Sequence, residues 1–303
     1  MSQTINSTLK SSDTEETLDI LFYRRIGYLI ARFSASVGIT PNMITIFSIF
    51  WGVLAGHLFY YQNLTLNLWG VFFLIFANSL DSADGQLARM TNNKTQLGRI
   101  LDGLAGNIWF LSIYAHLLLR LLNEGYGSYV IILCLVTGLV HIFQAAIADY
   151  YRNAHLFFIK GKSGSEFDSS EKLKAKYKAM KWSDAWFSKL FMASYINYTK
   201  EQELFTKNLQ SLVNEIQRKF PETIPPRIVD SFRKDNKPLM PITNILTFNT
   251  RSIVLFISVL SGYLLVYWLF ELIILTILLV YMVIKQEKIS KKYLQILKNE
   301  YNS

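Results

Sequence analysis

The chain has 303 residues, of which 51% are hydrophobic and only 17% are charged. Soluble domains carry about 25% charged residues, so this composition argues against an ordinary soluble protein and predicts several membrane spans. The formal net charge is +9, and the segment from Arg152 to Arg251 holds 18 basic but only 10 acidic residues. In so apolar a chain, the basic segment favours contact with membrane lipids and no nucleic-acid partner. The single cysteine, Cys134, excludes an intrachain disulfide framework.

The first 37 residues predict a tail followed by a surface helix. Residues 1–17 are polar and have no apolar signal segment, which is typical of a disordered tail. From residue 18 to 37, apolar residues recur at helical spacing with Arg24, Arg25 and Arg32 between them. This pattern predicts an N-terminal amphipathic interfacial helix that lies in the membrane surface.

Apolar stretches then predict an all-α integral membrane fold with six transmembrane helices. A spanning helix needs roughly 20 mostly apolar residues, because the hydrocarbon core is about 30 Å thick. The stretches that qualify are approximately 43–61, 66–88, 100–120, 127–150, 252–269 and 271–285. The last two are nearly continuous, and they predict a tight hairpin with Glu271 at its polar apex.

The loop charges predict how these helices are oriented. The basic clusters at 24–32, 89–99, beyond 150 and at 285–292 all fall on one side of a six-helix arrangement. The opposite loops, 62–67 and 120–127, carry few charges. Because basic loops stay in the cytoplasm, we expect a multi-pass protein of the cytoplasmic membrane with both termini cytoplasmic.

The polar stretch from 161 to 249 predicts a cytosolic insertion between helices 4 and 5. Residues 169–180 and 200–220 favour helices, whereas 221–241 holds five of the six prolines and is expected to be a loop. The alternative is a solvated basic linker. The expected division is 1–17 tail, 18–160 with helices 1–4, 161–249 insertion, and 250–303 with helices 5 and 6 and a basic tail.

Three aspartates near the cytoplasmic end of helix 2 and the start of helix 3 are candidate metal ligands. Asp81 and Asp84 fall on one face of helix 2, because each residue turns a helix by about 100°. A short polar turn lets helix 3 run back alongside it and bring Asp102 to the same place. Charged side chains at membrane depth are costly and are functional candidates by default. Oxygen-only ligands suit hard cations such as Mg²⁺ or Mn²⁺.

Small residues accompany these aspartates. Gly85 and Ala88 leave the carboxylate face without bulk, so a phosphorylated ligand can approach the backbone. The alternative, which also covers Gly98, is close packing between transmembrane helices. For the aspartates, the alternative is a set of ion pairs with Arg89 and Arg99.

The pattern Asp-x₂-Asp-Gly-x₂-Ala-Arg-x₈-Gly-x₃-Asp over residues 81–102 resembles the signature of the CDP-alcohol phosphatidyltransferase family. The segment Thr40-Pro41-Asn42-x-Ile44-Thr45 resembles the same family. The resemblance implies a homodimer with two metal ions held by Asp81, Asp84 and Asp102, and a site open to the cytosol. It also implies a nucleotide pocket lined by Asp81, Gly85, Ala88 and Arg89, and a catalytic role for Asp102.

The chain departs from the family signature at one position. A fourth aspartate, the proposed general base, is expected four residues after Asp102, and Gly106 stands there. Asp149 is the carboxylate without another role in helices 1–4, and we predict that it acts as the base. Arg152 follows at the same helix end and is a candidate for the acceptor's phosphate; the alternative is an interfacial Tyr/Arg belt. His141, inside helix 4, is expected to be a packing residue.

The leading functional hypothesis is metal-dependent transfer of a substituted phosphate from a CDP-linked donor, such as CDP-diacylglycerol, to an alcohol acceptor. The reaction would release CMP in membrane phospholipid synthesis. One alternative transfers a CDP-linked headgroup to a lipid alcohol such as diacylglycerol or ceramide. Another is a non-catalytic scaffold that binds CDP-lipid, which the loss of the fourth aspartate would permit. Transport is disfavoured, because paired broken helices are absent from the predicted pattern.

Overall fold

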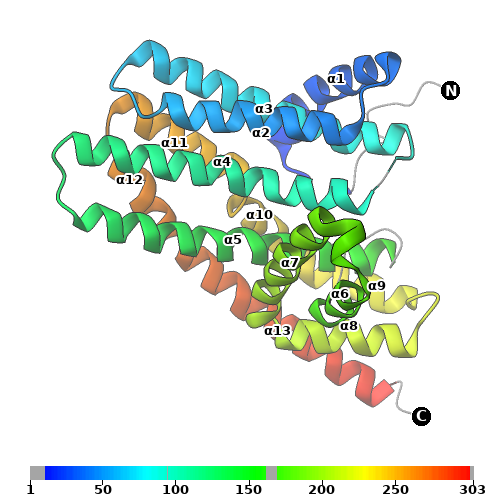
Figure 1. Ribbon diagram of the computed structural model, residues 1–303. Helices are drawn as coiled ribbons and strands as arrows, with labels where there is room; N and C mark the ends of the chain where they lie inside the picture. The colour runs from blue at the N-terminus through cyan, green and yellow to red at the C-terminus, as the bar shows by residue number, and fades with distance from the viewer. Residues whose placement is uncertain (1–10, 94, 162–168, 301–303) are drawn as a thin grey trace. The chain divides into compact units, whose positions relative to one another are not determined.

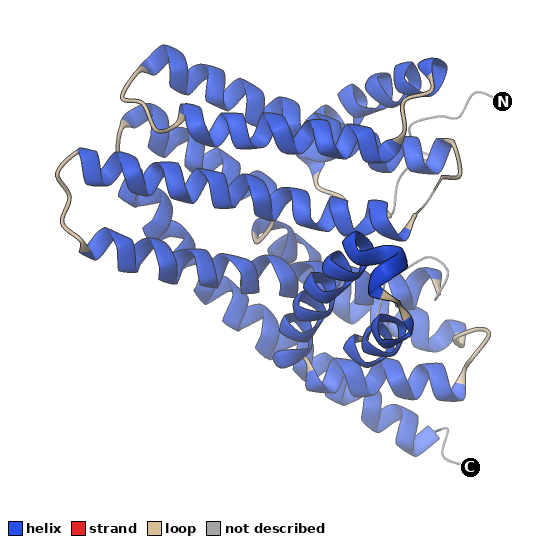
Figure 2. Cartoon of the chain, viewed as in Figure 1, coloured by secondary structure: helices blue, strands red, loops and turns tan. Residues whose placement is uncertain are grey.

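The computed structural model describes residues 11–93, 95–161 and 169–300, and these ranges contain helices and loops but no strand (Figures 1 and 2). Within them, six helices are long and apolar enough to cross a membrane. Their bounds are Pro41–Leu58, Leu64–Met90, Leu101–Asn123, Tyr129–Lys160, Pro226–Ser261 and Leu264–Glu300. The predicted all-α membrane fold with six spans is therefore confirmed.

The chain divides into two compact units. Unit 1 comprises Glu15–Ile142 and Phe248–Leu272 among the described residues. Its helices are η2 (Asp19–Tyr23), α1 (Arg24–Val37), α2 (Pro41–Leu58), α3 (Leu64–Met90), α4 (Gln96–Asn123), α11 (Phe248–Ser261) and α12 (Leu264–Leu269). In this unit α3 contacts α1, α2 and α11, and α2 also contacts α4 (Figure 1). The N-terminal segment expected to be an amphipathic helix is helical from Asp19 to Val37.

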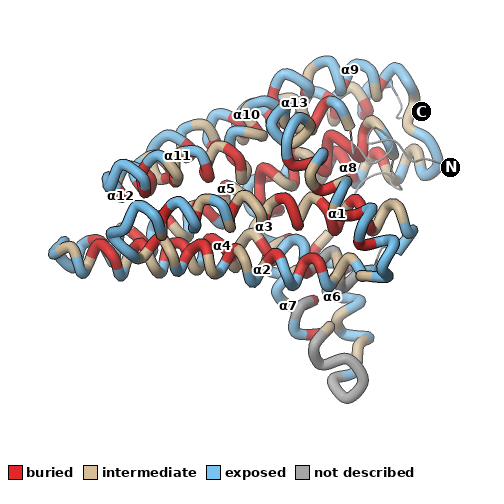
Figure 3. The backbone as a smooth tube through the Cα atoms, turned by 90° about the horizontal axis from the view of Figure 1, so that it is seen from above, coloured by how far each residue is buried: buried red, intermediate tan, exposed pale blue. Residues whose placement is uncertain are grey.

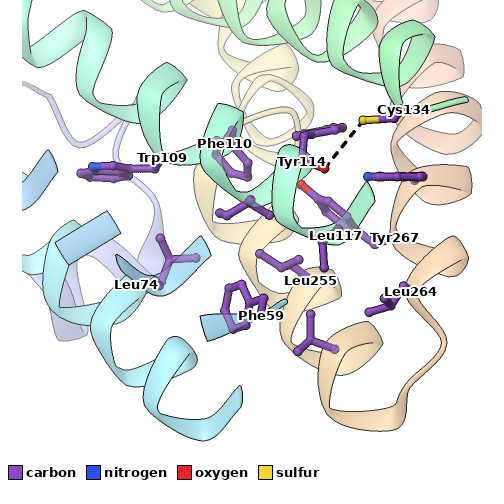
Figure 4. Close-up of a cluster of buried hydrophobic side chains, with 14 of the residues drawn as sticks. Phe59, Leu74, Trp109, Phe110, Tyr114, Leu117, Cys134, Leu255, Leu264 and Tyr267 are labelled. Atoms are coloured by element: carbon purple, nitrogen blue, oxygen red, sulfur yellow. Dashed lines mark hydrogen bonds between the residues drawn. The ribbon is translucent and has the colours of Figure 1, made fainter. Parts of the chain in front are cut away.

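An aromatic core holds unit 1 together. Phe59, Leu74, Trp109 and Tyr267 are buried in one cluster with Cys134 (Figure 4). Buried and exposed stretches alternate along α2 and α4 (Figure 3), as expected for helices that pack on one face only. Gly52 allows α2 to approach α4, because a Cβ at that position would lie 2.1 Å from a ring atom of Trp109.

A buried polar network also lies in unit 1. The guanidinium of Arg251 on α11 donates to Oε1 of Glu271 at 2.8 Å and to Nδ1 of His141. The hydroxyls of Tyr267, at 2.8 Å, and of Tyr114 donate to the same carboxylate. Arg251 is 1% exposed and Glu271 is fully buried. The expected hairpin apex at Glu271 is therefore wrong.

The chain turns instead at Gly262, whose φ of +80° is a left-handed conformation that glycine adopts without strain. Glu271 lies nine residues further on, in the π-helical segment η5 (Phe270–Leu275). The buried Arg251 compensates the negative charge of Glu271, so the carboxylate can lie inside the protein. His141 packs there as expected, but it also accepts a hydrogen bond from this arginine.

Unit 2 comprises Ser11–Thr14, Phe143–Thr247 and residues from Ile273 onward. Its helices are α6 (Ser170–Ala179), α7 (Trp182–Leu204), α8 (Lys207–Lys219), α9 (Pro226–Asn236), η4 (Lys237–Leu239), α10 (Met240–Ile245) and α13 (Thr276–Glu300). The helix α5 (Tyr129–Lys160) runs from one unit into the other. In unit 2, α6 packs on α7, and α13 contacts α8 and α9.

The proline-rich segment differs from expectation. Residues 221–241 were expected to form a loop, yet they are helical from Pro226 onward. Pro226, Pro238 and Pro241 each lie at the first or second position of a helix, where the missing N–H has no intrahelical partner to lose. Prolines here therefore mark three successive helix starts.

Residues 11–17, which composition assigns to the tail, make defined contacts; residues 1–10 lie outside the described part. The Asp13 carboxylate is buried and accepts from Arg233 at 2.6 Å, Lys237 at 3.0 Å and His155 at 3.3 Å. The hydrogen bond from Arg233, followed by those from Lys237 and His155, lowers the pKa of Asp13 below its usual range. These contacts hold Ser11–Thr14 within unit 2.

Candidate metal centre

Three carboxylates converge in unit 1. Asp81 and Asp84 lie on α3, and Asp102 lies on α4. One ligand oxygen from each lies within 4.8 Å of the others. Asp84 is 3% exposed, Asp81 is half-buried and Asp102 is exposed, so the cluster reaches from the interior to the surface. The sequence spacing predicted this convergence; metal binding by the three aspartates stays a prediction.

The distances between these carboxylate oxygens, all within 4.8 Å, suit coordination of a hard divalent cation. A Mg²⁺ ion takes oxygens at about 2.1 Å, so two oxygens on opposite sides of one ion are separated by about 4.2 Å. Two-metal phosphoryl-transfer sites place their ions roughly 3.5–4 Å apart. The donor set in the described part consists of carboxylates only, with no histidine or cysteine among them. The residues present therefore fit Mg²⁺ or Mn²⁺ better than zinc.

Thr45 orients the buried aspartate. Its hydroxyl donates to Oδ2 of Asp84 at 2.5 Å, and Thr45 is only 2% exposed. A charge-assisted bond of this kind holds one carboxylate oxygen in place and leaves the other for a ligand. Sequence reasoning singled out the segment that contains Thr45 but assigned the residue no role. The available signal was its position in the second turn of α2, five residues after the N-cap Thr40.

Packing accounts for Gly98 but not for Gly85. A Cβ at position 98 would lie 2.7 Å from Oδ1 of Asn42, at the start of α2. The glycine therefore allows α2 and α4 to approach each other beside the aspartates, as the packing alternative proposed. A Cβ at position 85 would only make an ordinary contact, 3.4 Å from the guanidinium of Arg89.

The candidate nucleotide residues lie on the same turns of α3. Gly85, Ala88 and Arg89 are all half-buried. The Nε of Arg89 is buried and has no acceptor among the described residues. An anionic ligand would supply such an acceptor. The alternative of ion pairs between the aspartates and Arg89 stays open, and the side chain of Arg99 lies outside the described part.

The face of α4 beyond Asp102 has room for a ligand. Cβ atoms built at Gly103 and Gly106 would meet no described atom within 4 Å. Asn107, the neighbour of the missing fourth aspartate, turns its amide to the carbonyl oxygen of Gly103 at 3.3 Å. Position 106 thus offers space without a carboxylate.

Asp149 and Arg152 are described within unit 2. Oδ2 of Asp149 accepts from the hydroxyl of Tyr198 at 3.4 Å and from the amide of Gln202 at 3.2 Å. Burial, with a further contribution from the Asp149 charge, raises the pKa of Tyr198, so this phenol stays a donor. Arg152 donates to Oδ1 of Asn244 at 3.0 Å. Their roles as base and acceptor site stay predictions.

Comparison with known proteins identifies the region around the carboxylates. Residues 38–175 match the family model of the CDP-alcohol phosphatidyltransferases, which confirms the resemblance read from the 81–102 pattern. Residues 38–175 thus form a CDP-alcohol phosphatidyltransferase domain.

Individual relatives match shorter segments. An uncharacterized protein of Aquifex aeolicus is 35% identical over 82 residues, which is 27% of this chain and 40% of that protein. An archaetidylinositol phosphate synthase of Pyrococcus horikoshii is 41% identical over 73 residues, 24% of this chain and 37% of that protein. A putative cardiolipin synthase of Mycobacterium tuberculosis is 27% identical over 73 residues, 24% of this chain and 34% of that protein. The chain thus spans less than half the length of these relatives, and no solved structure matches it.

Proposed function

We propose that this chain, whose residues 38–175 form a CDP-alcohol phosphatidyltransferase domain, transfers a substituted phosphate from a CDP-linked donor to an alcohol and releases CMP. CDP-diacylglycerol is the proposed donor. The observation that carries the proposal is the convergence of three carboxylates within 4.8 Å inside that domain. The named relatives include a synthase of archaetidylinositol phosphate and a putative synthase of cardiolipin, which supports a place in phospholipid synthesis.

The three aspartates have one task in this proposal. Asp81, Asp84 and Asp102 would hold Mg²⁺ or Mn²⁺, and the bound cations would neutralise charge on the donor's pyrophosphate. Thr45 would keep the buried Asp84 carboxylate in its orientation. Asp102 is the most exposed of the three, so it is the one best placed to meet the incoming donor and acceptor.

The donor and acceptor ends of the site have separate residues. Gly85, Ala88 and Arg89 would line the cytidine nucleotide beside Asp81, and the free Nε of Arg89 would donate to its phosphate. Arg152 would bind the phosphate of the acceptor or of a lipid. Asp149 is the base proposed from the sequence. Its carboxylate accepts hydrogen bonds from Tyr198 and Gln202.

The placement in the cell is part of the proposal. The distribution of basic loops supports a multi-pass protein of the cytoplasmic membrane with both termini and the site cytoplasmic. Cytidine nucleotides and polar acceptors are then available on the same side as Asp102. A homodimer is proposed from the family resemblance alone.

A second candidate function is a CDP-lipid-binding scaffold. The absence of a carboxylate at position 106 favours it, because a protein that binds its donor without turning it over does not need a base. The metal aspartates and the nucleotide residues would then serve binding only. Donor binding without CMP release is the expected behaviour of such a scaffold.

The test is CMP release by the purified chain in lipid nanodiscs. CDP-diacylglycerol and CDP-linked headgroups are each offered with a panel of polar and lipid alcohols, and products are read by mass spectrometry. We expect release that EDTA abolishes and that Mg²⁺ or Mn²⁺ restores. Asp84→Asn should lower turnover by orders of magnitude, whereas Glu171→Gln, a change of an exposed carboxylate on α6, should not. Activity that survives chelation would refute the metal mechanism, and donor binding without release in every pair would favour the scaffold.

A further inference from the structure

The acceptor half of the site lacks a carboxylate on α4. A general base is required if an alcohol is to attack the donor, and Gly106 stands where the family signature has its fourth aspartate. The space beside Gly106 is open, since a Cβ there meets no described atom within 4 Å. A carboxylate from another element of unit 1 can therefore reach toward this position.

The start of α11 packs against the turn of α4 that follows Gly106. The ring of Phe248 packs against Trp109, with centroids 5.8 Å apart, and against Phe110, with centroids 5.9 Å apart. These two aromatic residues occupy the turn of α4 that follows Gly106. Asn249, the next residue of α11, is therefore close to the same turn.

Asn249 brings two carboxylates to this place. Its Nδ2 donates to Oε2 of Glu16 and to Oδ1 of Asp19, each at 2.8 Å. Asn249 is only 5% exposed, and no described group donates to its Oδ1. Burying an amide oxygen without a donor is costly, so this atom is suited to accept a hydrogen bond from a ligand hydroxyl. An alcohol bound there would lie beside both carboxylates.

The segment η2, which carries Asp19, contacts α3, the helix that carries Asp81 and Asp84. Tyr23, one helical turn after Asp19, is buried and hydrogen-bonded to Asn78. Asn78 precedes Asp81 by one turn of α3.

Close packing keeps the N-terminal helix against the motif. A Cβ at Gly27 would lie 3.0 Å from the backbone nitrogen of Ala83 and 2.9 Å from the amide of Gln86, so α1 fits there only with a glycine. The buried Gln86 amide donates to the carbonyl oxygen of Arg24 at 3.1 Å. The segment that carries Asp19 is therefore fixed to the helix that carries Asp81 and Asp84.

We propose that Asp19 is the general base of the reaction and replaces the fourth aspartate that this chain lacks at position 106. The inference rests on the proposed function. Asp19 takes the proton of the acceptor hydroxyl, and the alcohol oxygen forms a bond to the donor phosphorus that carries the lipid. The bond from that phosphorus to the CMP oxygen breaks, and CMP leaves with the electron pair. Asn249 holds the Asp19 carboxylate in place through its Nδ2, and Asp19 returns the proton to solvent.

The experiment compares Asp19→Asn with the wild-type chain in nanodiscs. We expect acceptor-dependent CMP release to fall roughly 10²–10⁴-fold, the usual range for general-base catalysis. The Kd for the CDP-linked donor, measured with Mg²⁺ in the absence of acceptor, should change less than about twofold, because the metal aspartates are intact. Glu171→Gln, a change of an exposed carboxylate on α6, is the control and should keep near-normal turnover. A loss of rate in Asp149→Asn that equals the loss in Asp19→Asn would count against Asp19 as the base.

Rescue separates catalysis from a structural role. Gly106→Asp in the Asp19→Asn background restores a carboxylate where the structure has room for it, and it should recover at least tenfold of the lost rate. Near-normal turnover of Asp19→Asn would overturn the inference, as would a loss that Gly106→Asp does not recover or that is accompanied by lost donor binding. No CMP release by the wild-type chain with any donor would instead refute the proposed function itself, and the inference would fall with it.

Discussion

Replacing Arg251 with leucine should destabilise unit 1 by about 3–5 kcal/mol. The guanidinium is 1% exposed and lies 2.8 Å from Oε1 of Glu271, which is fully buried. Removing one partner of a buried ion pair leaves the other charge uncompensated in a medium of low dielectric, which is the costly case. The tyrosine hydroxyls that also bind this carboxylate stabilise it, but they carry no positive charge.

The assay is thermal unfolding of the purified protein in detergent. For proteins of this size class a change of 1 kcal/mol shifts Tm by about 2–4 °C, so the single variant should lose about 6–20 °C. The double variant Arg251→Leu with Glu271→Gln removes both charges and keeps an acceptor for the tyrosines. It should recover most of the lost stability, and the double-mutant cycle isolates the pair. A single variant as stable as the wild type, or a double variant no better than the single one, would refute the reasoning.

Three further predictions follow from the same structure. Thr45→Val should weaken the apparent Mg²⁺ affinity, measured by CMP release, by about 10–100-fold, because Asp84 loses the hydroxyl that orients it. Thr45→Ser keeps a hydroxyl and should leave the affinity unchanged. The same Mg²⁺ affinity in both variants would exclude this role for Thr45. A cysteine at Asn63 should react with an impermeant reagent from outside the cell and one at Asn93 only after permeabilisation; the reverse pattern would contradict the proposed orientation. The lowered pKa of Asp13 means that its stabilisation is complete above about pH 5 and is lost as the pH falls below about 4, where the unfolded carboxyl is protonated. Asp13→Asn should therefore lower Tm most at pH 7 and progressively less as the pH falls below about 4, because part of the stabilisation is already lost there; an equal loss at pH 7 and pH 3 would show that the charge does not matter.

Local patterns in the sequence were enough to predict the cluster of three aspartates and the membrane-spanning helices. Asp81 and Asp84 share a helix face by spacing alone, and a short turn returns Asp102 to them, so neighbouring helices suffice to assemble the cluster. The number of spanning helices follows from apolar length, because the bilayer requires about 20 residues for each span whatever the tertiary packing.

Contacts between distant segments were decided only by the tertiary structure. In the sequence, Glu271 resembles a polar hairpin apex because no local pattern links it to Arg251, 20 residues earlier. Only helix packing brings the two charges together. Asp19 belongs to an acidic N-terminal segment that has no motif, yet it meets Asn249 at 2.8 Å across 230 residues of chain. Such pairs leave no periodic pattern in the sequence from which they could be predicted, because their contact depends on which helix faces pack together. Sequence therefore determined the helices and the three aspartates of the candidate site. Packing determined which buried charges are compensated and which residues of the N-terminal segment meet α11.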